Sequence, residues 1–245
     1  MLLVLAACVP PNQGGFGGGG SSTGAGPIGG SPVDTAEDSS VDSGGETGLE
    51  TGDPDLDSDG DGFSDVDERA AGSDPTACWS VPSGWPQCLH EAEGVEGQGW
   101  RLGYTAPNWS APDQHGGELQ FHQLYGMVVV VDISSGWCPP CREAALAAED
   151  FYAEHRDDGV ILLHLMVEDL YGDPAAQPFL EDWAEQYGLS FPVLADDADV
   201  YEALYAEGYI QGIPAYFVYD RELVLQEGWS GHSAEYMNEA VARYK

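Results

Sequence analysis

The residues best suited to chemistry are two cysteines separated by two prolines, Cys138-Pro139-Pro140-Cys141. Thiols at this spacing can cycle between a dithiol and a disulfide, because one sulfur attacks a target and the other resolves the mixed disulfide. The residues around the motif predict that Cys138 lies at a helix N-terminus, where free amides and the helix dipole favour a thiolate. We therefore expect thiol-disulfide exchange here, with Cys138 as the nucleophile and Cys141 as the resolving thiol. The alternative is an inert structural disulfide.

The flanking sequence predicts a strand that leads into a helix and so positions the cysteines. Residues 127–131, MVVVV, have the pattern of a buried strand, and helix-compatible residues, EAALAAEDFYAEH, follow the second cysteine. Prolines are tolerated in a first helical turn because its amides have no helical partner. Trp137 directly precedes the motif and is expected to belong to the active-site turn.

The remaining pattern alternates strands and helices. Strands are predicted at 159–169, 191–196, 215–219 and 223–229, and helices at 175–187, at 200–206 and from 233 onward. This order predicts an α/β domain whose mixed sheet is covered by helices on both faces.

Residues 100–245 resemble the TlpA-like and redoxin group of exported, thioredoxin-fold thiol-disulfide oxidoreductases. Besides the dithiol segment, the resemblance rests on GYTAPNW at 103–109 and on GIP at 212–214, which AYFVYD follows. It implies that Pro214 is a cis-proline facing the dithiol and that a substrate strand pairs with the backbone of Ile213. Pro139 and Pro140 are expected to contribute to the same substrate surface.

The resemblance also gives a role to an acid inside the valine strand. Asp132 lies six residues before Cys138, where thioredoxins have a buried acid that handles the proton of the second cysteine. A buried carboxyl is costly unless it is hydrogen-bonded or functional. Two interpretations stay open: a proton acceptor for Cys141, or a satisfied acid without a catalytic role.

The expected function is thiol-disulfide exchange in the reducing direction, and two alternatives remain. A thiol peroxidase uses a single peroxidatic cysteine in a Pro-x-x-x-Thr-x-x-Cys context; here Ser135 stands three residues before Cys138, but the proline is missing. A non-enzymatic surface module would use the calcium segment and the thioredoxin-like fold only to present a binding face. The six histidines show no ligand spacing, and we assign them no role.

Residues 57–68, DSDGDGFSDVDE, match the twelve-residue calcium-loop pattern at every defined position. The expected oxygen ligands are the side chains of Asp57, Asp59, Asp61, Asp65 and Glu68 and the carbonyl of Phe63. Gly and Pro occupy the place of an incoming EF-hand helix, and the segment through GSDP at 72–75 instead resembles a thrombospondin type 3 calcium repeat. We expect a structural Ca²⁺ and no organic cofactor; a solvated acidic linker is the alternative.

Three further cysteines have other predicted roles. Cys8 ends the sequence Leu-Ala-Ala-Cys, which resembles a bacterial lipobox and implies lipidation of that cysteine. Cys78 and Cys88 are most simply a structural disulfide in an exported protein. A four-cysteine zinc site is disfavoured because this pair lacks the short spacing such sites use.

The predicted organisation is a lipoprotein signal at 1–8, a disordered Gly/Ser/acidic tether at 9–52, a calcium-binding repeat at 53–76, a disulfide-closed linker at 77–99 and a thioredoxin-like domain at 100–245. The expected location is the cell envelope, with membrane contact through the lipid anchor only.

The charge of the chain bears on its partners. Seven basic against 43 acidic residues give a formal net charge of −36. This charge argues against nucleic-acid binding, which depends on Lys and Arg. The partners that the resemblance implies are cysteine-containing exported proteins and a thiol protein that exchanges electrons with the dithiol.

Overall fold

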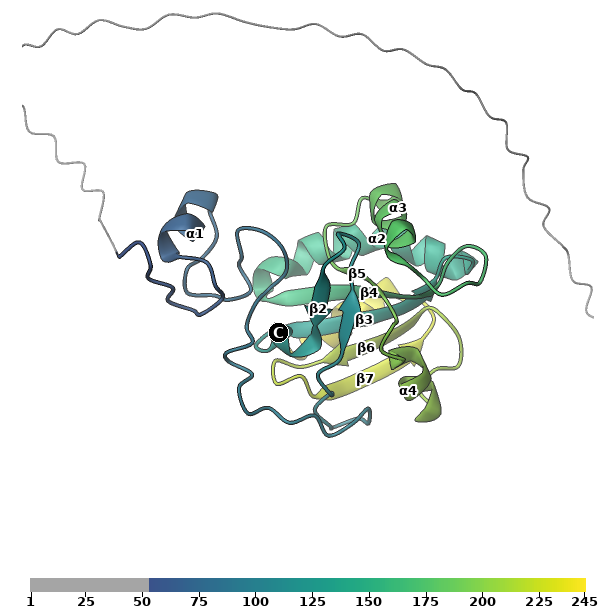
Figure 1. Cartoon of the computed structure of the whole chain (residues 1–245). Coiled ribbons are helices and arrows are strands. Elements are labelled where there is room, and N and C mark those ends of the chain that lie inside the picture. Colours follow the sequence, from purple (N-terminus) through teal and green to yellow (C-terminus); the bar gives the residue numbers. More distant parts are fainter. Residues whose placement is uncertain (1–52) are drawn as a thin grey trace, which may run out of the picture. The chain divides into compact units, whose positions relative to one another are not determined.

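The run of valines forms β3 (Val128–Ser135), the central strand of a five-stranded sheet in the computed structural model, which describes residues 53–245 (Figure 1). All eight residues of β3 are buried. A strand covered on both faces is apolar without alternation, which explains the unbroken valine pattern. The predicted signal at 1–8, with Cys8, and the tether at 9–52 lie outside the described residues.

The sheet is mixed, and its strand order is β5-β4-β3-β6-β7. The other four strands are β4 (Val160–Glu168), β5 (Val193–Ala195), β6 (Ala215–Tyr219) and β7 (Leu225–Ser230). β4 pairs in parallel with β3 and β5, whereas β6 is antiparallel to β3 and β7. The predicted mixed sheet is confirmed.

Three helices cover one face of this sheet (Figure 1). They are α2 (Pro139–His155), α3 (Gln177–Tyr187) and α5 (Ala234–Ala242). Apolar side chains of α2 such as Ala145 and Ala148 pack in the same cluster as Val128 and Val130 of β3. The face of β3 that carries Val128 and Val130 therefore lies beneath α2, and by alternation Asp132 belongs to that face.

The opposite face is covered by α4 (Val200–Ala206) and by residues before β3. The latter include the small antiparallel pair β1 (Ser110–Pro112) and β2 (Glu118–Gln120) and the 3₁₀ helix η1 (Phe121–Leu124). Phe121 is fully buried and its ring stacks on Trp109 at 4.9 Å. Helices thus lie on both faces, as predicted, but this preceding segment supplies a large part of the second layer.

A disulfide between Cys78 and Cys88 closes a loop that is tied to the sheet domain. The amide of Cys88 donates to the carbonyl of Gln123 at 2.8 Å, and Gln123 Nε2 donates to the Pro86 carbonyl at 2.7 Å. Trp85 Nε1 donates to Asp113 Oδ2 at 2.7 Å. The loop is therefore fixed against the domain by buried hydrogen bonds as well as by its cross-link.

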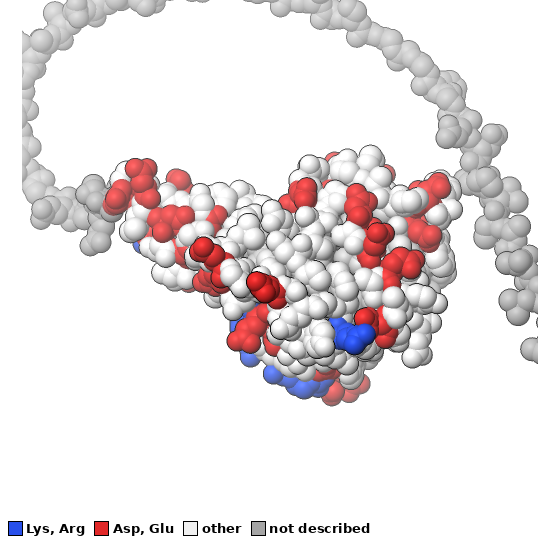
Figure 2. All heavy atoms as spheres, turned by 60° about the horizontal axis from the view of Figure 1, so that its bottom comes forward, with Lys and Arg blue, Asp and Glu red and all other residues white. Residues whose placement is uncertain are grey.

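The surface is strongly acidic. Figure 2 shows Asp and Glu side chains spread over the visible face, with Lys and Arg in only a few places. Within residues 53–245, no helix combines the length and the apolar character needed to cross a membrane.

Candidate functional site

Cys138 is the N-cap residue of α2, with Pro139 and Pro140 in the first helical turn. The amide of Cys141 donates to Cys138 Sγ at 3.3 Å, and the two cysteines form a disulfide with a Cα–Cα distance of 5.3 Å. Both sulfurs belong to buried residues, but Cys138 retains 3% exposure while Cys141 has none. The geometry therefore offers Cys138, and not Cys141, to an incoming partner.

The turn before Cys138 depends on a glycine and on a break in strand pairing. The register between β3 and β4 shifts between Ser134 and Ser135, which ends the regular ladder just before the motif. At Gly136 an added Cβ would lie 2.7 Å from Phe179 Cζ and 2.9 Å from the Asp169 carbonyl carbon. Only glycine permits this close approach, which brings the motif beside the end of β4.

The Ile213–Pro214 peptide bond is cis, and this segment lies beside the dithiol. Cys138 Sγ is 3.7 Å from the carbonyl oxygen of Ile213, although the two residues are 75 positions apart. Pro214 directly precedes β6, which pairs with β3. The sheet register therefore brings together the two segments that the sequence pattern marked separately.

A groove of about 660 Å³ opens over the dithiol. Its walls include Trp137, Cys138, Pro139, Pro140, Val167, Tyr201, Gly212 and Ile213, together with four acids, Glu168, Asp196, Asp199 and Glu202. No Lys or Arg is among the lining residues. The groove thus presents apolar surface and negative charge to whatever approaches Cys138.

Trp137 stands at the edge of this groove with 46% of its surface exposed. Its indole Nε1 donates to Glu168 Oε2 at 2.6 Å, which fixes the ring across from the end of β4. An exposed, oriented indole next to a reactive sulfur offers contact area to a peptide partner. The structure places Trp137 directly before Cys138 at this groove, and its part in the reaction stays a prediction.

Asp132 is 1% exposed and lies in β3 on the face beneath α2. The Ser134 hydroxyl donates to Asp132 Oδ1 at 2.9 Å. Burial raises the pKa of Asp132 to about 7, and hydrogen bonds from Ser134 and Tyr216 oppose that rise. The pKa of Asp132 is therefore higher in the folded chain than in the unfolded chain, where it is near 3.8. This difference stabilises the fold fully below pH 3.8, and the stabilisation is lost as the pH rises through about 7.

His164 faces Asp132 across the parallel pair β3–β4, with Nδ1 3.3 Å from Asp132 Oδ2. Burial lowers the pKa of His164 to about 3, so the ring is neutral at physiological pH and supplies no charge to the carboxylate. On the other side, Tyr216 of β6 is the cross-strand partner of Asp132. The sequence pattern showed none of this, because strand register decides which residues become neighbours.

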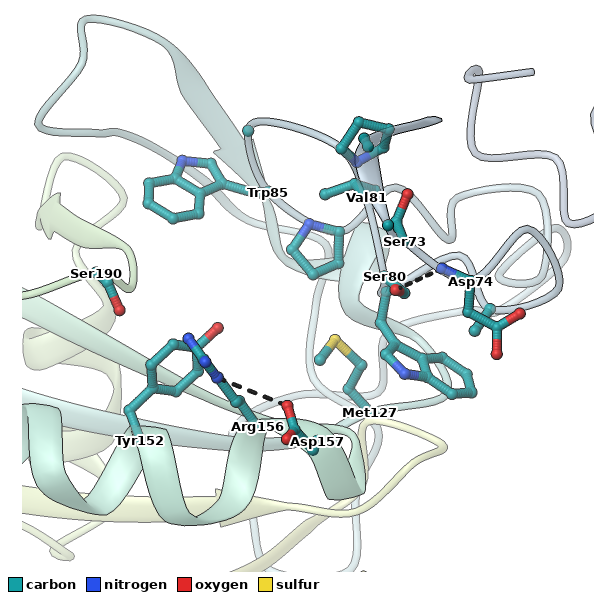
Figure 3. A pocket seen from close by; sticks show the side chains of 17 residues that line it. Ser73, Asp74, Ser80, Val81, Trp85, Met127, Tyr152, Arg156, Asp157 and Ser190 are labelled. Carbon is teal, nitrogen blue, oxygen red and sulfur yellow. Dashed lines mark hydrogen bonds and ion pairs between the residues drawn. The ribbon is translucent and has the colours of Figure 1, made fainter. Parts of the chain in front are cut away.

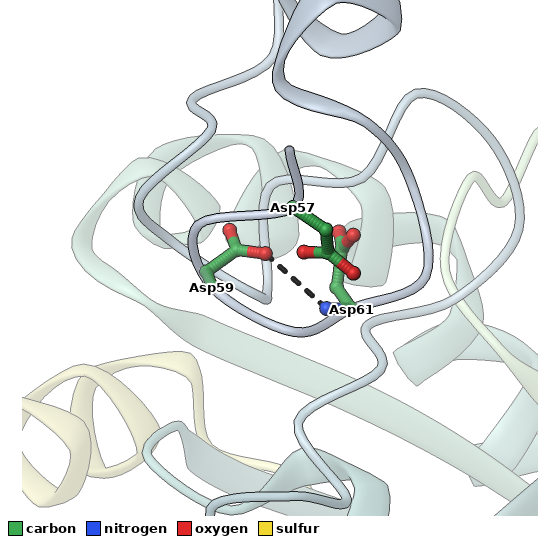
Figure 4. Close-up of side chains that lie close together, drawn as sticks. All are labelled: Asp57, Asp59 and Asp61. Carbon is green, nitrogen blue, oxygen red and sulfur yellow. Dashed lines mark hydrogen bonds between the residues drawn. The ribbon is translucent and has the colours of Figure 1, made fainter. Parts of the chain in front are cut away.

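The acidic loop of residues 57–68 gathers three carboxylates, from Asp57, Asp59 and Asp61 (Figure 4). One oxygen from each lies within 4.8 Å of the others. Asp59 Oδ2, Asp61 Oδ2 and both carboxylate oxygens of Glu68 are buried without a hydrogen-bond partner among the described residues. Burial and the neighbouring acids raise the pKa of Glu68 to about 7. Unpartnered buried carboxylate oxygens fit a hard divalent cation.

Asp65 has a different place from the other expected ligands. Its carboxylate accepts from the Ser58 amide at 2.8 Å, from the Ser58 hydroxyl at 2.9 Å and from Arg69 at 3.1 Å. It opens the short helix α1 (Asp65–Ala71), which the sequence analysis did not expect. Phe63, also an expected ligand, donates its amide to Asp61 Oδ1 at 2.8 Å. Through these hydrogen bonds Asp65 links the start of the acidic loop at Ser58 to the start of α1.

A second cavity, of about 780 Å³, lies between the disulfide-closed loop and the end of α2 (Figure 3). Its walls include Trp79 and Trp85 from the loop and Tyr152 and Arg156 from the sheet domain. None of its lining residues also lines the dithiol groove. The two cavities are therefore separate features of the surface.

Two family models match the chain. The model described as the AhpC/TSA family matches residues 102–227, and the model of the bacterial TSP3 repeat matches residues 57–77. The first match contains the dithiol, Asp132 and Pro214; the second contains the acidic loop. Both agree with the resemblances seen in the sequence.

Curated relatives carry names of redox proteins. The thiol-disulfide oxidoreductase ResA of Bacillus thuringiensis is 27% identical over 122 residues, covering 50% of this chain and 65% of that protein. ResA of Geobacillus thermodenitrificans is 29% identical over 49% of this chain and 64% of that protein. The thioredoxin-like protein YneN of Bacillus subtilis is 23% identical, and the match covers 59% of this chain and 79% of that protein. The chain thus spans between 51% and 65% of the length of the ResA relatives it matches.

Solved structures are also similar to the chain. A thiol:disulfide interchange protein of the thioredoxin family from Chlorobium tepidum has a TM-score of 0.49 at 21% identity, covering 57% of this chain and 94% of that one. StoA from Bacillus subtilis has a TM-score of 0.43 at 23% identity, and the match covers 54% of this chain and 93% of that one.

Proposed function

The chain belongs to the AhpC/TSA family, and we propose that it is an extracytoplasmic thiol-disulfide oxidoreductase that uses Cys138 and Cys141. The observation that carries this proposal is the position of Cys138: its sulfur caps a helix, lies beside the Ile213 carbonyl and lines an open groove. The names of the ResA relatives support the same chemistry.

The geometry supports a two-step exchange. In the reduced protein, the Cys138 thiolate attacks a substrate disulfide, forms a mixed disulfide and releases the first substrate thiolate. Cys141 then gives its proton to Asp132 and attacks Cys138 Sγ, which forms the intramolecular disulfide and releases the second substrate thiolate. Solvent protonates both leaving thiolates. An extended substrate segment beside Ile213 would be held next to the reacting sulfur by backbone hydrogen bonds.

The proposed substrates are exported proteins with cysteine pairs, and a separate thiol protein is proposed to restore the reduced state. We propose the reducing direction, and the equilibrium potential against glutathione tests it. A value of about −270 mV is that of a reductant, whereas about −120 mV is that of an oxidant.

The protein is expected to reduce the interchain disulfides of insulin with dithiothreitol as electron source. The measurement is the rate of precipitation of the insulin B chain with and without the protein. Peroxide consumption is followed in parallel, because a thiol peroxidase would consume peroxide faster than it reduces insulin. Absence of both activities in correctly folded protein would favour the non-enzymatic surface module instead.

A structural Ca²⁺ is the proposed occupant of the acidic loop. Asp57, Asp59, Asp61 and Glu68 would hold the ion through carboxylate oxygens, and the bound cation would neutralise charges that otherwise repel one another. Residues 53–76 contribute nothing to the lining of the dithiol groove. We therefore propose a structural role for the ion, outside the redox reaction.

The proposed location is the cell envelope, with the chain held to a membrane through a lipid on Cys8. Cys8→Ala is expected to release the protein from the membrane fraction without changing insulin reduction in vitro, because the redox residues lie more than a hundred positions further along the chain. Fractionation followed by immunoblotting measures the release. Continued membrane association of the variant would contradict lipidation at Cys8.

A further inference from the structure

Three polar side chains lie in one row across the sheet beneath α2. His164 of β4, Asp132 of β3 and Tyr216 of β6 are direct cross-strand partners, so all three project from the same face. Each is at most 2% exposed. Buried polar groups are costly, and a continuous row of them calls for an explanation beyond packing.

The row has a route to solvent at only one of the two residues that flank Asp132. His164 is completely buried, and neither of its ring nitrogens makes a hydrogen bond with a described residue. Tyr216, in contrast, has its hydroxyl 3.0 Å from His232 Nδ1. His232 follows β7 and belongs to the exposed residues, so its imidazole connects a buried hydroxyl with water.

The stacked rings around Tyr216 hold this connection in place. The Tyr216 ring stacks on Trp229 at 5.3 Å, and Trp229 contacts Tyr236 of α5 edge to face at 4.7 Å. Tyr216 is also the direct cross-strand partner of Asp132, and its hydroxyl lowers the pKa of the Asp132 carboxyl against the larger effect of burial. The Tyr216 side chain thus lies between the buried acid and the exposed imidazole.

We propose that Tyr216 and His232 form a proton relay between Asp132 and solvent, and that they set the rate at which Asp132 loses its own proton and so becomes able to accept the proton of Cys141. This inference rests on the proposed function, because it takes Asp132 as the proton acceptor of Cys141. Asp132 lies on the face of β3 that α2 covers, and Cys141 lies in the first turn of α2.

Each proton that enters the relay from Cys141 is matched by one that leaves it to water. Cys141 passes its proton to the Asp132 carboxylate and attacks Cys138 Sγ. Asp132 then donates to the Tyr216 oxygen while the Tyr216 hydroxyl proton moves to His232 Nδ1. His232 releases a proton to water from Nε2, and exchange of the remaining ring proton through water, from Nδ1 to Nε2, restores the starting tautomer. No redox change accompanies the transfer, and the electrons remain with the sulfurs.

Oxidation of the reduced protein by glutathione disulfide tests the relay, with acid quenching, alkylation and mass spectrometry to follow the sulfurs. In the wild type, resolution of the mixed disulfide is expected to accelerate as the pH rises through about 7, because only ionised Asp132 accepts a proton. His232→Ala is expected to slow this step about tenfold below pH 7, less than the ~10²–10⁴ typical of a general base, because water partly replaces the imidazole. Added imidazole is expected to restore the rate.

Three further variants give the experiment its controls. His115→Ala removes another exposed histidine and is expected to leave the rate unchanged. Tyr216→Phe should slow resolution without rescue by imidazole, because the link to Asp132 is missing. In an Asp132→Asn background, His232→Ala should have no additional effect, since the two residues act in one chain.

Equal rates for His232→Ala and His115→Ala would overturn the relay, as would additive effects of Asp132→Asn and His232→Ala. The substrate here is a small disulfide, so these rates are measurable whether or not the protein reduces insulin. Failure to reduce insulin would therefore count against the proposed function alone. Thermal unfolding of each variant checks that slow resolution does not come from loss of the fold.

Discussion

Cys138→Ser is expected to abolish insulin reduction, whereas Cys141→Ser is expected to trap a covalent mixed disulfide with the substrate. The physical reason is the asymmetry of the two sulfurs. Cys138 caps α2 and lines the groove, while Cys141 is fully buried behind it. A serine at position 138 leaves no accessible nucleophile, and a serine at position 141 leaves the mixed disulfide without a resolving thiol.

Non-reducing electrophoresis with mass spectrometry of the adduct measures the trapped species. The double variant, Cys138→Ser with Cys141→Ser, is the matched control and should form no adduct. Cys78 and Cys88 stay oxidised in their own disulfide and serve as an internal reference. Trapping by Cys138→Ser in place of Cys141→Ser would reverse the assignment of nucleophile and resolving thiol.

Arg69 is already exposed on α1, and chelation of calcium with EGTA is expected to unfold this helix and let an arginine-specific protease cleave at Arg69, while the fragment that contains Cys138 stays active. Arg69 is the only Lys or Arg before Arg101, so cleavage there gives a defined product. Without a cation, the buried carboxylates of the loop repel one another, and α1 loses the support of that loop. Peptide mapping by mass spectrometry in Ca²⁺ and in EGTA measures the difference.

Two substitutions in the same segment separate ion binding from general acidity. Asp59→Asn removes a buried carboxylate of the cluster and should permit cleavage at Arg69 even in Ca²⁺. Asp55→Asn changes an exposed acid outside the cluster and outside α1 and should behave as the wild type. Equal cleavage in Ca²⁺ and in EGTA would contradict a structural ion. Loss of insulin reduction on chelation would show that the segment regulates the dithiol site.

Much of the fold followed from local patterns. The valine run predicted β3, and the prolines at the start of a helical stretch predicted that Cys138 lies at the N-terminus of α2. These patterns are informative because burial on both faces selects apolar strands and because first-turn amides tolerate proline. The same analysis missed the β1–β2 pair and α1, since three-residue strands and a seven-residue helix carry little periodic signal.

Part of the site could also be predicted from the sequence alone. The identity and spacing of the two cysteines specify a dithiol, and the acidic loop pattern specifies a set of oxygen donors, because both depend on neighbours along the chain. The loop pattern also named Asp65, whose carboxylate accepts hydrogen bonds from Ser58 and Arg69, and a part for it in ion binding stays a prediction. A twelve-residue pattern gives residue types at positions, but side-chain rotamers decide which oxygens face inward.

Tertiary structure alone decided the long-range neighbours of the dithiol. The 3.7 Å approach of Cys138 to Ile213 joins residues 75 positions apart, and the row of His164, Asp132 and Tyr216 joins three strands. Such contacts follow from the register of a sheet with parallel and antiparallel pairs, and a shift of one residue would turn Tyr216 to the opposite face. Register is set by the packing of the whole core, so His232 has no visible role until the sheet has formed.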